Sequence, residues 1–410
     1  MRMSFNMKFN LGLNGVINTN AKMSRAQEQL IKQTRILTPA DDPAASAKVL
    51  GLDQNLAQME QYQNNSILLK NNLALEETVL SNMQLSMDRA RVLAIASGNG
   101  TYAEQDLQAV AAELRQIQVE LLDLMNTKNA DGGYIFSGYQ DKVTSYEFNP
   151  VTNAFEFQGD DGQKALQISS TIALPGNDSG KMVFDDVNAR FKTSDLTIVA
   201  GGATSASIKV NNQTQFDAFY RNTYDSLVPA NNTFNLVLSA PDSYEIQQNG
   251  SPLVPAVTGT FSPGQTINFR GLALQVEGPA VPGQLDFTLN PPVKKNVLNT
   301  LQDFIQVLET PGLASFDRFE AISDATVQLE NSMATLGNAM SSIGGRVNVL
   351  DSVFETNEDL KINNKSYRAD LSEVDYAAAI TEINKQEIAL QAISATFTKV
   401  SSVSLFDFIR

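Results

Sequence analysis

The spacing of apolar side chains in the last hundred residues constrains the fold more than any other feature of this chain. One series of alternating three- and four-residue steps comprises Leu329, Met333, Leu336, Met340, Ile343, Val347, Leu350 and Phe354. After a polar interval a second series comprises Tyr376, Ile380, Ile383, Leu390, Ile393, Phe397 and Val400. On an α-helix such residues form one narrow stripe, the a and d positions of a coiled coil. The stripe predicts a partner helix, in this chain or in a neighbouring copy.

The first third of the chain shows the same spacing. A long helix is predicted from Ala44 to Ser97, with Glu76 the one poor fit to its apolar stripe. A second helix is predicted over residues 103–127, and a Gly-containing turn joins the two as an antiparallel hairpin. Residues 1–20 are Asn-rich and weakly patterned, so before residue 33 a helix is expected only from Ala21 to Lys32.

Two short acidic motifs are interpreted as helix starts. Pro39 and Pro43 flank Asp41 and Asp42, and each proline disfavours helix at the residue before it. A turn with an Asp cap for the next helix explains this pair better than a metal or catalytic site does. The pattern Asp370-x-x-Glu373 resembles a capping box and predicts that the final helix starts at about Leu371.

Between residues 141 and 291 the helical spacing disappears, and short runs with a period of two replace it. Gly, Pro, Asn and Asp separate these runs, which predicts antiparallel β structure. The predicted strand segments are residues 146–148, 155–157, 166–168, 208–210, 234–238, 267–269, 274–276 and 285–289. This region is therefore predicted to be a mostly β domain inserted between two helical regions.

Composition excludes several classes of function. The 410 residues include no His, Cys or Trp, which removes most zinc sites, thiol nucleophiles and neutral-pH proton shuttles. The net charge of −15 disfavours nucleic acid and anionic membranes as partners. We therefore expect neither an enzyme nor a cofactor. Polar Asn residues interrupt the first 15 residues, so no Sec-type signal peptide is predicted there.

These patterns together predict an α+β protein, with long N- and C-terminal helices packed as a coiled-coil rod and the β domain inserted in the middle. The expected rod is formed by residues 45–140 and 292–370. The terminal arms, residues 1–44 and 371–410, remain apolar beyond the rod, which predicts surfaces for a head-to-tail assembly. The predicted interface residues are Ile380, Ile383, Leu390, Ile393, Phe397, Val400, Leu405, Phe406 and Phe408.

Several motifs resemble the flagellin superfamily of axial bacterial flagellar proteins, and within it the hook–filament junction proteins. The first is the turn motif with Arg35, Pro39, Asp41, Asp42 and Pro43. Segments similar to the junction proteins also occur at residues 98–101, 133–138, 343–351, 371–377 and 405–409. Gln33 is a departure, because the family usually has Gly at that position.

The resemblance implies a structural adaptor exported by the flagellar type III apparatus without a cleaved signal peptide. It implies a homo-oligomeric ring outside the cell, between a second junction protein on the hook side and flagellin on the other, and an export chaperone as a further partner. Two alternatives remain open at this point: a flagellin-type filament subunit, and a surface adhesin that binds through the β insertion. An enzyme in the insertion has no carboxylate pair of suitable spacing to support it.

Overall fold

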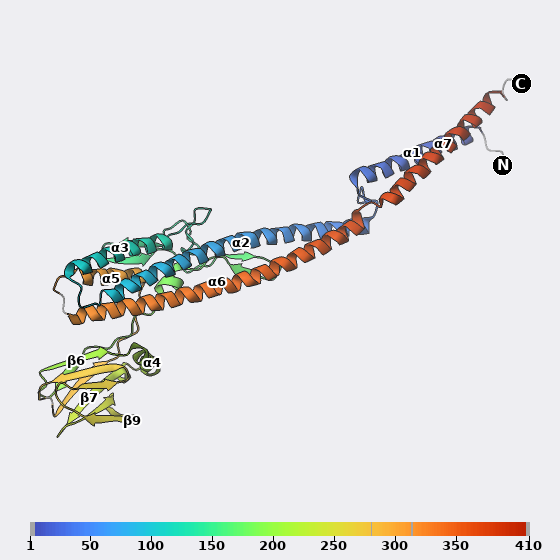
Figure 1. The fold of residues 1–410 in the computed structure, drawn as a ribbon. Coiled ribbons are helices and arrows are strands. Elements are labelled where there is room, and N and C mark those ends of the chain that lie inside the picture. Colours follow the sequence, from blue (N-terminus) through green and yellow to red (C-terminus); the bar gives the residue numbers. More distant parts are fainter. Residues whose placement is uncertain (1–4, 280, 313–314, 407–410) are drawn as a thin grey trace. The chain divides into compact units, whose positions relative to one another are not determined.

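The structure, a computed structural model, describes residues 5–279, 281–312 and 315–406. Long helices lie at both ends of the chain and a β-rich region lies between them, so the predicted α+β class is confirmed (Figure 1). The chain forms two compact units. Unit 1 comprises Met1–Asn71, Ala165–Leu174 and Arg346–Arg410, and unit 2 comprises Asn72–Lys164 and Pro175–Gly345. Residues 165–174 thus group with the terminal helices in unit 1.

Unit 1 contains α1 (Phe5–Lys32), α7 (Tyr376–Phe406), the first part of α2 (Pro43–Ala96) and the last part of α6 (Ser315–Ser372). Helix α1 begins at Phe5 and not at Ala21, so the expectation that the helix starts only at Ala21 was wrong. The Asn residues that obscured the pattern are accommodated because α1 packs along α7, and tertiary packing outweighs weak local propensity.

Within unit 1, α2 and α6 run antiparallel. The Asp53 carboxylate pairs with Arg368 at 2.5 Å, and Lys70 pairs with Asp351 at 2.7 Å, so residue numbers fall along α6 as they rise along α2. A small hairpin of β3 (Ala165–Gln167) and β4 (Ala173–Pro175) packs on this helix pair. Its Ile168 is fully buried and accepts a hydrogen bond from the Asn357 side chain at 2.8 Å.

Unit 2 contains the rest of α2 and α6 together with α3 (Glu104–Met125) and α5 (Val297–Glu309). Most members of the apolar stripes predicted for these helices are buried in it. The buried members are Leu73, Leu80, Met83, Met87, Ala90, Ala94, Leu107, Val110, Leu114, Ile117, Leu121, Leu329, Leu336 and Ile343. The poor fit, Glu76, is also buried, and it accepts a hydrogen bond from the Asp178 N–H at 3.1 Å.

Helix α7 starts later than the sequence predicted. Helix α6 continues to Ser372, so Asp370 and Glu373 do not cap the last helix. The cap is Asp375, whose carboxylate accepts hydrogen bonds from the N–H groups of Ala377 and Ala378 at 2.9 and 3.1 Å. The predicted position was wrong because Asp375 lies directly before Tyr376, whereas Asp370 is still inside α6.

The β-rich part of unit 2 contains a hairpin of β1 (Tyr146–Asn149) and β2 (Ala154–Phe157), a short π-helix η1 (Lys181–Asp185), and a β sandwich. The five-stranded sheet of the sandwich has the order β5-β12-β7-β8-β9, and the three-stranded sheet has the order β10-β11-β6, with all neighbouring strands antiparallel. The bounds are β5 Thr197–Ala200, β6 Ser205–Val210, β7 Thr233–Ser239, β8 Ser243–Gln248, β9 Ser251–Thr260, β10 Thr266–Phe269, β11 Leu272–Glu277 and β12 Gly283–Thr288.

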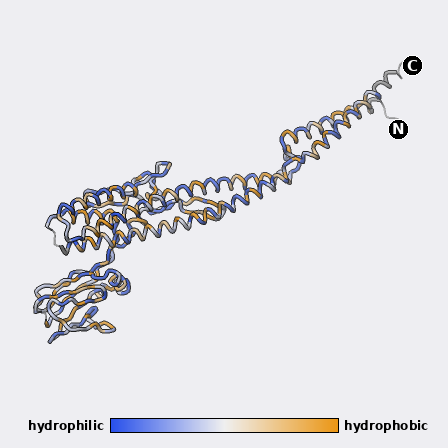
Figure 2. Tube along the Cα trace, viewed as in Figure 1, coloured by the Kyte–Doolittle hydropathy of each residue, from blue (hydrophilic) through white to orange (hydrophobic). Residues whose placement is uncertain are grey.

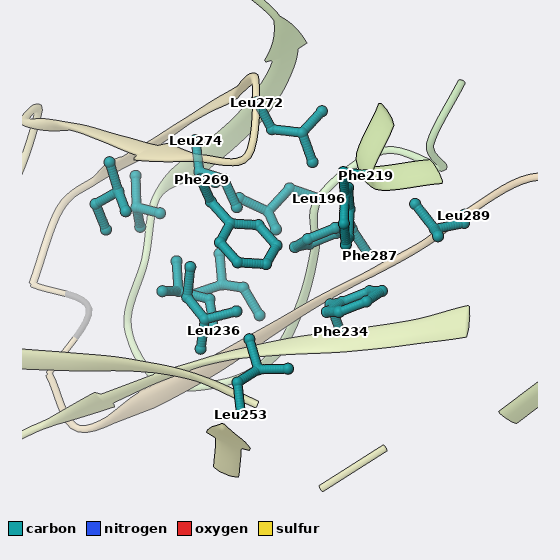
Figure 3. Packing of buried hydrophobic residues seen from close by; sticks show 14 of the residues in the cluster. Leu196, Phe219, Phe234, Leu236, Leu253, Phe269, Leu272, Leu274, Phe287 and Leu289 are labelled. Carbon is teal, nitrogen blue, oxygen red and sulfur yellow. The ribbon is translucent and has the colours of Figure 1, made fainter. Parts of the chain in front are cut away.

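One apolar core joins the two sheets to α4 (Gln213–Thr223), which follows β6, while the short 3₁₀ helix η2 (Pro229–Asn232) precedes β7. Phe219, Phe234, Phe269 and Phe287 meet at its centre (Figure 3), and the Phe234 and Phe287 rings stack with centroids 5.4 Å apart. Each predicted strand segment corresponds to an observed strand, but α4 was missed. Its N-cap, Asn212, accepts a hydrogen bond from the Gln215 N–H. An Asn at this position is the local sequence signal that could have revealed the helix.

The two segments that connect the sandwich to the helices of unit 2 are fixed to α6. The guanidinium of Arg190, whose side chain is only 2% exposed, pairs with Glu320 at 2.6 Å and with Asp324 at 3.1 Å. Its Nε atom donates to the side chain of Gln213, the first residue of α4. Farther along α6, Gln328 donates to the carbonyl of Lys295. A buried cation paired with two carboxylates and an amide holds its neighbours in one geometry.

Candidate assembly surfaces

The turn between α1 and α2 is built on the two adjacent aspartates of the turn motif. Asp42 is the N-cap of α2, because its carboxylate accepts the Ala45 N–H at 3.0 Å, and Pro43 occupies the first helical position. Asp41 closes the turn by accepting the N–H groups of Leu37 and Thr38, both at 3.0 Å. These backbone bonds are the largest reason why the pKa values of both carboxyls lie below the ordinary range.

Arg35 connects this turn to the end of α6. Its guanidinium donates to Asp42 at 3.2 Å and to the carbonyl of Leu371 at 3.0 Å, while its own N–H donates to the Ser372 carbonyl at 2.8 Å. Thr34 and Glu373 form an isolated antiparallel bridge beside it. The turn after α1 and the turn before α7 are therefore joined into one structure, at which α1 ends and α7 begins.

Gln33 directly follows α1 and lies in the left-handed region, with φ of 57°. Glycine adopts this conformation without steric cost, whereas a residue with a Cβ atom is strained there. Gln33, which stands where the family that the sequence resembles usually has Gly, thus lies at a position where the backbone favours Gly. Its carbonyl accepts the Val374 N–H at 3.3 Å, so Gln33 also takes part in the connection between the two turns.

Small residues on α1 allow α7 to approach closely. A Cβ atom added to Gly12 would lie 2.9 Å from the Phe397 ring, and one added to Gly15 would lie 3.7 Å from Ile393. Thr19 and Ala26 continue the same face of α1 and are buried. Sequence reasoning missed this face, because it searched for large apolar residues. Small residues recurring at steps of three, four and seven were the signal that could have found it.

The outward faces of α1 and α7 remain apolar and exposed (Figure 2 shows hydrophobic and hydrophilic residues alternating along both helices). Ile31 on α1 is 82% exposed, and Ile388 on α7 is 67% exposed. The other large exposed residues of the pair are Met7, Phe9, Leu11, Leu13, Ile17, Tyr376 and Ile380. A surface of this kind on two paired helices is typical of a protein–protein contact.

The predicted interface residues fall into three groups. Ile380 is exposed, with 51% of its surface accessible. Four residues are partly buried in unit 1, namely Ile383, Leu390, Ile393 and Phe397, and the Phe397 ring contacts that of Phe9 with centroids 4.9 Å apart. Val400, Leu405 and Phe406 lie in α7 at positions whose side chains are not described, and Phe408 lies outside the described residues.

A groove of unit 1 lies where the two turns meet. It has a volume of about 810 Å³. Its apolar lining includes Ile36, Leu37, Val49, Leu50 and Tyr376.

No helix in the described part of the chain is long and apolar enough to cross a membrane. Among the same residues, no group of acidic side chains is placed to hold a metal ion.

Comparison with protein families identifies the N-terminal part of the chain. Residues 3–141 match the family described as the bacterial flagellin N-terminal helical region. This segment includes α1, the turn motif, α2 and α3, so it covers one of the two helices that carry the exposed apolar faces.

Curated relatives extend the similarity beyond this region. The flagellar hook-associated protein 3 of Escherichia coli is 23% identical over 414 aligned residues, which cover 100% of both chains. The protein of the same name from Salmonella typhimurium is 28% identical over 189 residues, 46% of this chain and 58% of that protein. A crystal structure of hook-associated protein-3 from Legionella pneumophila has a TM-score of 0.58 at 22% identity, over 78% of this chain and 98% of the other. The last likeness shows the fold alone.

Proposed function

Because this chain is homologous over its full length to flagellar hook-associated protein 3, we propose that it is a structural adaptor subunit of the bacterial flagellum. Its copies form a ring that joins the hook, through a second junction protein, to the flagellin filament. The observation that carries the proposal is the full-length alignment, which includes both α1 and α7. The adaptor acts mechanically, without catalysis and without a cofactor.

The proposed assembly arms are residues 1–44 and 371–410. Their support is the exposure of Ile31, Ile380 and Ile388 on two helices whose inward faces already contact each other. Residues 45–140 and 292–370 are proposed as the helical region that carries the arms, and residues 141–291 as the β insertion. Because the inward faces of α1 and α7 are occupied within the chain, the outward faces are left for neighbouring subunits.

The proposed location is outside the cell, at the junction between hook and filament. The chain reaches it through the flagellar export route without a cleaved signal peptide, assisted by an export chaperone. This agrees with relatives that are named as flagellar components. A homo-oligomeric ring, a second junction protein and flagellin are its proposed partners, with no role for nucleic acid or membrane.

Electron microscopy of a strain that lacks the protein tests the adaptor role against its nearest alternative. An adaptor is required between two other structures, so its loss is expected to leave hooks intact, remove filaments and release flagellin monomers into the medium. A flagellin-type subunit predicts a different result. In that case hooks keep their junction proteins, and restoring the gene lengthens the filament in proportion to the amount of protein.

Ile380→Asp tests the arms directly. Ile380 is 51% exposed, so the charge is solvated in the free chain but is buried without a partner if a neighbour covers this face. Filament formation is expected to fail while the thermal unfolding of the monomer stays unchanged. Gln116→Glu is the matched control, since it adds the same charge at an exposed position on α3. Normal filaments with Ile380→Asp would contradict the assignment.

A further inference from the structure

The turn between α2 and α3 holds a chemically reactive pair that the assembly role does not use. The chain contains three Asn–Gly pairs, at Asn14, Asn99 and Asn249. From their different hydrogen bonds we infer that Asn99–Gly100 is a spontaneous modification site, where the asparagine converts to aspartate and isoaspartate through a cyclic succinimide. The folded structure protects the other two pairs.

The reaction needs only water as co-reactant. The peptide nitrogen of the following residue loses its proton and attacks the side-chain carbonyl carbon of the asparagine. A new nitrogen–carbon bond closes a five-membered ring, the bond from that carbon to the side-chain nitrogen breaks, and ammonia leaves. Water then opens the ring at either carbonyl, giving aspartate or isoaspartate. Glycine in the following position favours the attack, because it has no side chain to obstruct the approach and lets the backbone rotate.

At Asn99 both exposure and hydrogen bonding favour this attack. Asn99, Gly100 and Thr101 are all exposed, so water and base reach the turn. The Gly100 N–H donates no hydrogen bond to any residue that the structure describes, so its proton is available. The Thr101 N–H donates to the Asn99 side-chain oxygen at 3.2 Å. That oxygen becomes negative when the ring closes, and a donor already aimed at it stabilises the intermediate.

Asn249–Gly250 has the same sequence but a different environment. It forms the two-residue turn between β8 and β9, with both residues at positive φ. The Gly250 N–H donates to the side-chain oxygen of Asn235 at 2.9 Å, and Asn235 is buried on β7. The nitrogen must give up this bond before it can attack. Both flanking strands also restrict the rotation that brings nitrogen and carbon together.

Asn14–Gly15 is protected by secondary structure. Both residues lie inside α1, where peptide N–H groups donate along the helix and φ and ψ are held at helical values. Ring closure would require local opening of α1. The three pairs therefore differ in the state of one atom, the peptide nitrogen after the asparagine, and this atom is unbonded only in the turn after α2, as far as the structure describes the chain.

Peptide mapping by mass spectrometry of the folded full chain tests the inference. The chain is incubated at mildly alkaline pH in isotopically labelled water, so that every ring opening incorporates the label. Asn99 is expected to convert first. Asn249 is expected to be at least roughly five-fold slower, the factor that one net hydrogen bond supplies. In urea the difference is expected to disappear. Equal rates in the folded chain, or the same ratio in urea, would overturn the proposal.

Two substitutions test whether the state of the peptide N–H after each asparagine sets its rate of conversion. Gly100→Ala is expected to suppress conversion at Asn99, and it is sterically permitted because an added Cβ atom meets nothing within 4 Å. Asn235→Ala removes the acceptor of the Gly250 N–H and is expected to accelerate conversion at Asn249 while leaving Asn99 unchanged. Circular dichroism verifies that the sandwich remains folded. No acceleration in a folded Asn235→Ala chain would contradict protection by this bond.

Discussion

The α1–α7 pair and the β sandwich differ in how much of their apolar side-chain surface they bury within the chain. In the sandwich, Phe234 and Phe287 are at most 1% exposed, and two sheets and α4 close around them. In the helix pair, Ile388 and Ile31 are 67% and 82% exposed, and the buried positions are held by small or polar residues such as Ala379 and Gln386. The sandwich therefore completes its core within the chain, whereas the pair buries only its inward faces.

This difference distinguishes the residues that stabilise the chain from the surface that we propose for assembly. Burial of apolar area is the main favourable term in folding, so a closed aromatic core stabilises the chain that contains it. An exposed apolar face contributes nothing until a partner covers it. Substitutions in the sandwich are thus expected to change unfolding, and substitutions on the outward faces of α1 and α7 to change association. The following predictions are ordered from the largest expected effect to the smallest.

Phe287→Ala is expected to destabilise the sandwich by about 3–5 kcal/mol, the usual cost of removing a buried aromatic side chain. Phe287 is 1% exposed and stacks on Phe234, so neighbouring groups cannot close the resulting cavity without moving two sheets. Urea denaturation, with hydrogen exchange of β7 and β12 as the local probe, measures the loss. Val254→Ala on β9 is the control, because Val254 is 95% exposed and its truncation is expected to change stability by less than about 0.5 kcal/mol.

Phe397→Ala makes the corresponding change in the helix pair. Phe397 is only partly buried and contacts Phe9 and Gly12, so the expected loss is about 1–2 kcal/mol. Hydrogen exchange of α1 and α7 in the dilute monomer measures it. Gln391→Ala, at an exposed position of the same helix, is expected to have little effect. A loss as large as that of Phe287→Ala would show that the pair has a closed core and would remove the contrast.

Asp42→Ala probes the turn that joins the pair to α2. It removes the N-cap bond to Ala45 and the pairing with Arg35, so unit 1 is expected to unfold at a lower temperature, with a smaller shift than Phe397→Ala causes. These contacts lower the pKa of Asp42 from 3.8. The contribution of the ionised Asp42 to the free energy of unfolding is therefore present at neutral pH and is lost as the pH falls below that value. A difference between variant and wild type that persists at lower pH would contradict this origin.

Gln33→Gly is expected to be the smallest effect and the one of opposite sign. Gln33 has φ of 57°, so glycine relieves backbone strain and stabilises the end of α1 by about 0.5–1 kcal/mol. Thermal unfolding of the full chain measures the gain. Gln27→Gly is the matched control, because the same change inside the helix is expected to destabilise it by about 0.5–1 kcal/mol. A loss of stability in both variants would show that the strain at Gln33 is offset by its other contacts.

Pattern reasoning succeeded where one residue class recurs at a fixed period. The stripe from Leu329 to Leu350 predicted a buried helix face, and members of it such as Leu336 and Ile343 are almost fully buried. The runs with a period of two predicted strands, including β7 and β12. Pattern reasoning failed at two helices, for two different reasons. Helix α4 was missed inside a β-rich stretch, and the early start of α1 was missed because glycine and asparagine have low helix propensity.

The sequence by itself determined the α+β class, the absence of thiol and imidazole chemistry, and the acidic turn with its cap, because these depend on residue type and short-range spacing. Only the tertiary structure decided that Gly12 and Gly15 receive Phe397 and Ile393 and that Arg190 fixes the connecting segments to α6. It also decided that, among the described residues, the Gly100 N–H has no acceptor while the Gly250 N–H is bonded. The reason is physical. Such contacts join residues far apart in the chain, and which of them meet depends on how the helices and sheets pack, which no local period encodes.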